Sequence, residues 1–156
     1  MKRRHTGPGF TILEVIVVIL IFGIFAAVAV YSLSVTRAMG RDDRRVSDIS
    51  VMRAAMSQYW LQKASYPQND PVDLGRPGTG ADGLTTDGFV SKEQPGPGIV
   101  ILDQIPTGPS SGEYYRYHGS AKGYSLRFKT ERQTAYGAAG TWYAHAGGVD
   151  QEYTEK

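Results

Sequence analysis

The 156-residue chain contains no cysteine. Disulfides, thiolate metal ligands and a cysteine nucleophile are therefore excluded. Proline is absent between positions 9 and 66, so no proline interrupts a helix over this range. The 17 basic and 15 acidic residues nearly balance at a net charge of +2. This balance leaves no whole-domain basic face, and no nucleic-acid partner is expected.

Charge is also missing from a long N-terminal stretch. Glu14 is the single charged residue between Phe10 and Leu33, and the 17 residues of 15–31 carry no charged or amide side chain. A membrane helix needs roughly 17–25 mostly apolar residues, whereas a helix at a soluble surface keeps one polar face. We therefore predict a membrane-spanning helix over residues 10–33.

A cleaved secretory signal is the alternative for this stretch. The basic start and the small residues at 26–29 would fit such a signal, but its apolar core is usually only 7–15 residues long. Basic residues flank the stretch on both sides, so counting positive charges leaves its orientation in the membrane open.

Glu14 is the most informative residue of the stretch. A carboxylate in hydrocarbon costs on the order of 3 kcal/mol or more, and such residues usually mark a function. No lysine or arginine lies within the span to pair with it. Either Glu14 lies at the membrane interface and its side chain reaches water, or it finds a cationic partner outside its own helix.

The residues Gly9-Phe10-Thr11-Ile12-Leu13-Glu14 follow a short basic leader and precede the apolar run. This arrangement resembles the prepilin signature of type IV pilins and pseudopilins. The resemblance implies that a prepilin peptidase cuts between Gly9 and Phe10 and N-methylates Phe10. It also implies a single-pass protein of the bacterial inner membrane, with a cytoplasmic N-terminus and an extracytoplasmic C-terminal domain. From there the subunit enters a pseudopilus or pilus with the help of an inner-membrane assembly platform.

The same resemblance supplies a partner for Glu14. Cleavage creates an α-amino group, whose ordinary pKa is near 8, on Phe10. In a filament this cation meets the carboxylate of a neighbouring subunit, and a desolvated charge is far less costly when it is paired. The chain is then expected to assemble with copies of itself and with other pilin-like subunits. Many type IV pilins have a proline at the position of Tyr31, so no proline kink is expected here.

Residues 34–65 are predicted to continue the helix with one apolar face. The residues that recur every three or four positions, and that we expect to pack on a sheet, are Val46, Ile49, Met52, Met56 and Tyr59, with Lys63 at the end of the same stripe. The helix should end before Pro67. We expect the cluster Arg41–Arg45 to be a solvated neck paired locally with Asp42 and Asp43, with contact to lipid headgroups or to a partner's acidic patch as the alternative.

Residues 66–156 predict a small antiparallel sheet. Period-two alternation indicates strands around Tyr115–Tyr117 and over residues 124–130, joined by a hairpin loop at 119–123. Residues 99–102 predict a short buried strand, residues 141–143 one more strand, and residues 67–98 a long loop. We expect one face of the sheet to pack on the helical stripe and the other to face water. This α+β plan resembles pilins, and most closely the major pseudopilins of type II secretion.

Several motifs carry no predicted chemistry. Residues 78–83 spell a dinucleotide-binding fingerprint but lack its strand and helix context, so we interpret them as a loop. His118 and His145 show no ligand spacing, and no enzyme activity is expected. Major pseudopilins bind calcium in a C-terminal loop, for which residues 137–148 are the equivalent candidate. The nearby acids, Asp150 and Glu152 with Asp103 distant in sequence, match no calcium template. No cofactor is predicted, and calcium stays an alternative without assigned ligands.

The sequence thus predicts a structural pilin-like subunit in four parts: a cleaved leader (1–9), a membrane and polymerisation helix (10–33), its amphipathic continuation (34–65) and a globular domain (66–156). The alternative is a membrane-anchored extracytoplasmic binding domain that does not polymerise. A secretion pseudopilus, a competence pilus and an adhesive pilus remain open, as does a major or minor role.

Overall fold

The computed structural model describes residues 9–94 and 96–154. Two compact units divide the chain between Arg37 and Ala38, and helix α1 (Ile12–Lys63) contributes to both. The α1 helix ends as predicted before Pro67. Ala64 adopts a left-handed conformation (φ 51°), and its N–H donates to the carbonyl of Trp60 at 2.8 Å, which closes the last turn.

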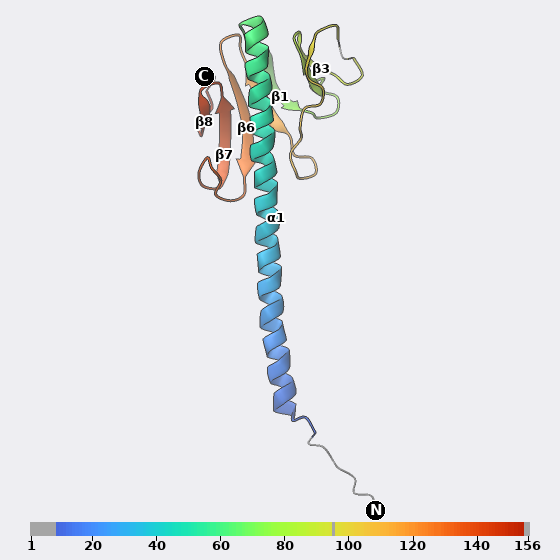
Figure 1. Ribbon diagram of the computed structural model, residues 1–156, viewed down its shortest axis with the longest axis vertical. Coiled ribbons are helices and arrows are strands. Elements are labelled where there is room, and N and C mark those ends of the chain that lie inside the picture. The colour runs from blue at the N-terminus through green and yellow to red at the C-terminus, as the bar shows by residue number, and fades with distance from the viewer. Residues whose placement is uncertain (1–8, 95, 155–156) are drawn as a thin grey trace, which may run out of the picture. The chain divides into compact units, whose positions relative to one another are not determined.

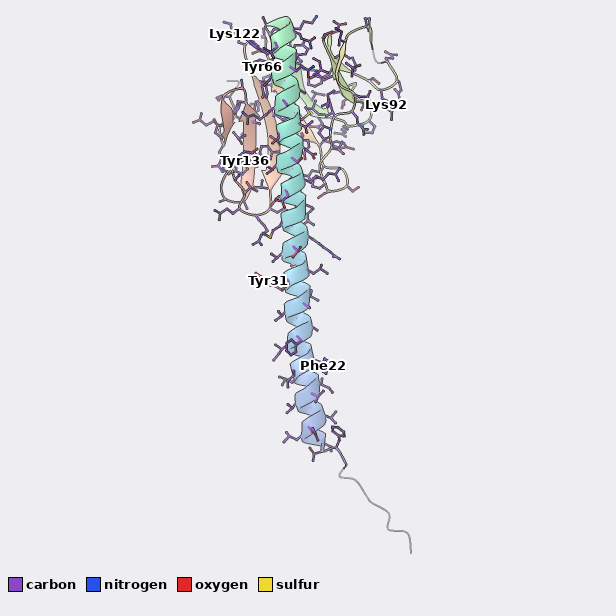
Figure 2. All side chains as sticks on the ribbon, viewed as in Figure 1. Phe22, Tyr31, Tyr66, Lys92, Lys122 and Tyr136 are labelled. Atoms are coloured by element: carbon purple, nitrogen blue, oxygen red, sulfur yellow. The ribbon has the colours of Figure 1, made fainter. Side chains whose placement is uncertain are left out.

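The first unit is the apolar part of α1. By length and composition it is the one stretch among the described residues that is long enough and apolar enough to cross a membrane, and none of this stretch is buried. Phe22 and Tyr31, labelled in Figure 2, are each 70% exposed. A helix that exposes so many large apolar side chains needs an apolar surrounding, namely lipid or other helices.

The second unit contains two antiparallel sheets beside the C-terminal part of α1 (Figure 1). The larger sheet has the order β1-β5-β6-β7-β8 and the smaller has the order β3-β2-β4. The strands of the larger sheet are β1 (Asn69–Leu74), β5 (Tyr115–Gly119), β6 (Tyr124–Thr130), β7 (Gly140–His145) and β8 (Gly148–Asp150). Those of the smaller sheet are β2 (Gly83–Thr85), β3 (Gly88–Val90) and β4 (Val100–Leu102). The predicted α+β fold is confirmed.

The core lies between α1 and the inner face of the larger sheet. From the predicted stripe, Ile49, Met52, Met56 and Tyr59 are buried, whereas Val46 is half-buried and Lys63 is exposed. The sheet residues in the same apolar cluster include Tyr115, Tyr117, Tyr124, Leu126, Phe128, Trp142 and Ala144. Alternate residues of β5, β6 and β7 thus face the helix, as period-two alternation requires.

The outer face of the larger sheet is only partly in water. Ser125 and His145 belong to this face by alternation, yet they are 2% and 1% exposed. The chain after β8 folds back over them: His145 contacts the carbonyl of Glu152, and the ring of Tyr153 stacks on His118. The prediction of a fully solvated face is therefore wrong at this end of the sheet.

The prediction of a long loop over residues 67–98 is also wrong, because β1, β2 and β3 lie within it. Pro71 is tolerated because β1 is an edge strand whose register shifts between Asn69 and Val72. The strands β2 and β3 have only three residues each, too few to show a period in the sequence.

Two smaller expectations change as well, and a third is confirmed. A strand forms at residues 100–102, but Ile99 and Val100 are 70% and 53% exposed, so it is not the buried strand we predicted. Half of the proposed calcium-loop equivalent, residues 137–148, belongs to strand β7, and β8 was not predicted. The fingerprint at residues 78–83 leads into strand β2 rather than a helix, in agreement with its interpretation as a loop.

Candidate functional site

The predicted cleavage site lies just outside α1. Gly9 and Phe10 have no regular secondary structure, and the Phe10 side chain is 79% exposed. Glu14, also exposed, is the third residue of the helix. Residues 1–8 of the predicted leader lie outside the described residues. The structure thus places a non-helical dipeptide, the start of a helix and a lone carboxylate within six residues of one another.

Thr11 caps this helix, a role that was not predicted from the sequence. The N–H of Glu14 donates to Thr11 Oγ1 at 3.2 Å and to the Thr11 carbonyl at 3.1 Å. A threonine at the N-cap with a glutamate three residues later is the capping-box pattern, and this signal was available in the sequence. The cap fixes where the helix begins, and the negative charge of Glu14 suits the positive end of the helix dipole.

The first unit also offers a place for close helix approach. A Cβ atom built on Gly23 would meet nothing within 4 Å. Gly23 and Ala27 lie one turn apart, and pairs of small residues with this spacing let helices pack closely.

A second polar site joins α1 to the larger sheet within the second unit. Arg45 is 4% exposed, and its guanidinium binds three carboxylates. It holds Glu113 in two bonds, Nε to Oε1 at 2.7 Å and Nη2 to Oε2 at 2.8 Å. Its Nη1 donates to Asp42 at 2.7 Å and to Glu131 at 2.8 Å. Arg41 donates to Glu131 as well. We name Arg41, Asp42, Arg45, Glu113 and Glu131 the ionic cluster.

Asp42 connects the helix to the backbone after β6. Its carboxylate accepts from the N–H of Glu131 at 3.0 and 3.1 Å and from the N–H of Arg132 at 2.8 Å. Asp42 is 3% exposed, and its two oxygens are used by these donors and Arg45. A buried charge with this many partners escapes most of the desolvation penalty.

The ionic cluster shifts the acidity of its members. Hydrogen bonds from Arg41 and then Arg45 lower the pKa of Glu131 to about 2. The hydrogen bond from Arg45 lowers the pKa of Glu113. Beside the cluster, burial raises the pKa of Asp48, and this carboxylate accepts a 2.7 Å hydrogen bond from the hydroxyl of Tyr115. These carboxylates hold the helix on the sheet through directional bonds in addition to apolar packing.

The expectation of a solvated neck at Arg41–Arg45 is therefore wrong. Asp42 and Arg45 are buried. They pair with each other as expected, but their other partners come from residues 68 to 90 positions away. Arg44 is exposed as expected, with a side chain 60% exposed and 4.0 Å from Asp48. The sequence showed the alternating charges, but which of them would be buried depended on the position of the sheet.

The histidines and C-terminal acids serve the fold. His145 Nδ1 lies 3.0 Å from the carbonyl of Tyr124 and Nε2 lies 3.3 Å from Asp150 Oδ1. Asp150 also accepts from the N–H of Glu152 at 2.9 Å. Among the described residues, no three His, Asp or Glu side chains are grouped so as to hold a metal ion.

Comparison with known proteins finds a family motif at the N-terminus and a relative that matches most of the chain. The prokaryotic N-terminal methylation motif matches residues 8–30. The type II secretion system core protein G of Klebsiella michiganensis is 31% identical over 113 residues, which cover 72% of this chain and 74% of that protein.

Two further core proteins G match over shorter ranges. That of Vibrio cholerae is 36% identical over 70 residues, 45% of this chain and 48% of its own length. That of Aeromonas hydrophila is 39% identical over 69 residues, 44% of this chain and 47% of its own length. No solved structure matches the chain significantly.

Proposed function

The chain belongs to the family of the type II secretion system core protein G, and from that premise we propose that it is a structural, pilin-like secretion subunit that polymerises through the N-terminal part of α1. The observation that carries the proposal is the fully exposed apolar helix with one carboxylate, Glu14, near its start. A chain that kept this helix in lipid permanently would gain nothing from that carboxylate.

Processing is the first step that we propose. A prepilin peptidase hydrolyses the peptide bond between Gly9 and Phe10 and methylates the new α-amino group. This bond lies in a non-helical segment, where its backbone is not held by helical hydrogen bonds. Cleavage also removes the three cations Lys2, Arg3 and Arg4, which would be costly inside a filament.

Assembly follows from the new charge pair. The α-amino group of Phe10 is cationic near neutral pH, and Glu14 of a neighbouring subunit supplies the compensating carboxylate. The α-amino group of Phe10 and Glu14 each occupy a fixed position along the helix. Their pairing therefore also sets the axial offset between neighbouring subunits. The small residues Gly23 and Ala27 allow the helices to approach closely.

The proposed location follows from the same steps. The protein is anchored in the bacterial inner membrane by the first unit, with a cytoplasmic N-terminus and an extracytoplasmic second unit. An inner-membrane assembly platform then moves it into a pseudopilus together with copies of itself and other pilin-like subunits.

The intact mass of the membrane-bound protein tests the proposal. We expect a chain that begins at N-methylated Phe10 when the prepilin peptidase is present, and the full-length chain when it is absent. A terminus at Met1 in both strains, or a terminus after residues 26–29, would show that the segment is a permanent anchor or a secretory signal.

A further inference from the structure

The outer face of the larger sheet carries a row of uncovered cations. Arg116 on β5 and Arg127 and Lys129 on β6 alternate with core residues and are exposed. Arg116 lies directly opposite Arg127 in the register, and Arg127 lies opposite Tyr143. Like charges directly opposite each other on neighbouring strands destabilise a sheet, so this arrangement costs the isolated subunit stability.

Local acids neutralise this row only in part. Asp73 on β1 is 3.4 Å from Arg116 Nη1 and 3.2 Å from Arg76 Nη1, so two cations share one carboxylate. Within the part of the chain that the structure describes, Arg127 and Lys129 have no ion-pair partner. We name Arg76, Arg116, Arg127 and Lys129 the cationic patch. Residues 66–156 carry eight basic and eleven acidic residues, so the patch runs against the net charge of its own domain.

The opposite charge gathers around the smaller sheet. Residues 82–103 contain four acids and one base. Three of these acids, Asp82, Glu93 and Asp103, line a cavity of about 570 Å³, together with Lys92. The smaller sheet and strands β6–β8 lie on opposite sides of the C-terminal part of α1 (Figure 1), and Figure 2 labels Lys92 on the side of the smaller sheet. We name this region the acidic cavity.

We propose that the cationic patch of one subunit docks on the acidic cavity of the next copy of this chain. The two surfaces have opposite charge and are made of different residues, so the cationic patch of one copy can meet the acidic cavity of the next. Such heterologous contacts generate open helical assemblies rather than closed dimers. The docking rests on the proposed polymerisation and adds to it a contact between globular units that involves neither Phe10 nor Glu14.

The absence of native cysteine gives a direct test. In the full chain, Lys129→Cys is combined with Asp103→Cys, and filaments are oxidised and then separated without reductant. We expect a ladder of dimers, trimers and larger species that collapses on reduction. Each single-cysteine variant should stay monomeric, because a heterologous contact never brings two copies of the same residue together. Lys122→Cys with Asp103→Cys is the matched control, since exposed Lys122 lies in the β5–β6 hairpin loop outside the cationic patch.

An exchange of charges between the two surfaces tests whether electrostatic attraction stabilises the proposed contact. Arg127→Glu should lower filament yield about tenfold, the effect of a contact made worse by about 1.4 kcal/mol. Adding Asp103→Lys to this variant should restore most of the yield.

The outcomes separate this contact from polymerisation itself. If Lys129→Cys/Asp103→Cys forms filaments but no ladder, the proposed contact is wrong and polymerisation stands. Dimers from Lys129→Cys alone would show a self-complementary contact and would equally overturn the proposal. If the unaltered chain forms no filaments, the proposed function fails and this contact fails with it.

Discussion

Arg45 on α1 and Glu113 before β5 form a two-bond ion pair, with nitrogen–oxygen distances of 2.7 and 2.8 Å across 68 positions of sequence. The pair is the centre of the ionic cluster, in which one nearly buried guanidinium serves three carboxylates. It fixes the rotation of α1 relative to the sheet, because the apolar stripe alone tolerates small rotations of the helix.

Replacing Arg45 should therefore destabilise the second unit. Arg45→Met leaves Asp42, Glu113 and Glu131 close together without their shared cation. We expect a loss of about 2–4 kcal/mol in the free energy of unfolding, reduced from a fully buried pair because Glu131 is partly exposed. Arg44→Met is the matched control and should change stability by less than about 0.5 kcal/mol. Urea unfolding of both variants checks this, and equal midpoints would show that the ionic cluster contributes nothing.

Acid should weaken the same cluster. The native pKa of Glu131 is about 2, below its ordinary value of 4.5, so the unfolded state takes up this proton first as the pH falls. The stabilising contribution of Glu131 is full above about pH 4.5 and is lost as the pH falls toward 2. The lowered pKa of Glu113 also makes stability fall with decreasing pH, whereas the raised pKa of Asp48 has the opposite effect on stability.

Melting temperatures between pH 6 and pH 2 measure this effect. Glu131→Gln should flatten the decline below pH 4.5 relative to the unaltered chain. Curves that stay parallel over the whole range would mean that Glu131 is not held as an anion by its arginines.

The apolar stripe predicts a second stability result. Met56 is 0% exposed and Tyr59 is 7% exposed, so Met56→Ala and Tyr59→Ala should each destabilise the second unit by about 2–5 kcal/mol. Val51→Ala, on the other side of the helix at 44% exposure, should have an effect within about 0.5 kcal/mol. Unchanged melting temperatures for both core variants would contradict the packing of α1 on the sheet.

Glu14→Val tests assembly apart from insertion. Removing the carboxylate should leave membrane insertion normal or better, and cleavage after Gly9 should continue. Filament yield should nonetheless fall sharply, because the α-amino group of the neighbouring Phe10 is then buried without a partner at a cost of roughly 3–5 kcal/mol.

The readout is sheared filament relative to total membrane-bound subunit. Glu14→Asp keeps the charge with a shorter reach and should be intermediate. A wild-type yield from Glu14→Val would mean that Glu14 merely reaches the membrane interface.

Calcium should have little effect on this chain. Asp150 already accepts from the N–H of Glu152 and lies beside His145, and no third ligand joins them among the described residues. We expect the same melting temperature in millimolar calcium and in excess chelator. A rise with calcium that Asp150→Asn abolishes would reveal a site that forms only with the ion.

The sequence by itself determined the long N-terminal helix of this protein. Helical periodicity, the apolar run and the capping residues act between positions three or four apart, so α1 and its lone carboxylate Glu14 were visible without a fold. The hairpin of β5 and β6 was equally visible, because its alternation and its loop are local.

Only the tertiary structure decided which polar residues are buried and which short segments pair. Arg45 and Arg44 are neighbours of the same type, and one is buried solely because the sheet brings Glu113 and Glu131 to its side of the helix. The strands β2, β3 and β8 have three residues each, and their pairing depends on partners that the chain must first bring close. Local sequence carries no information on such contacts, because the free energy that selects them comes from burial and hydrogen bonding across the folded domain.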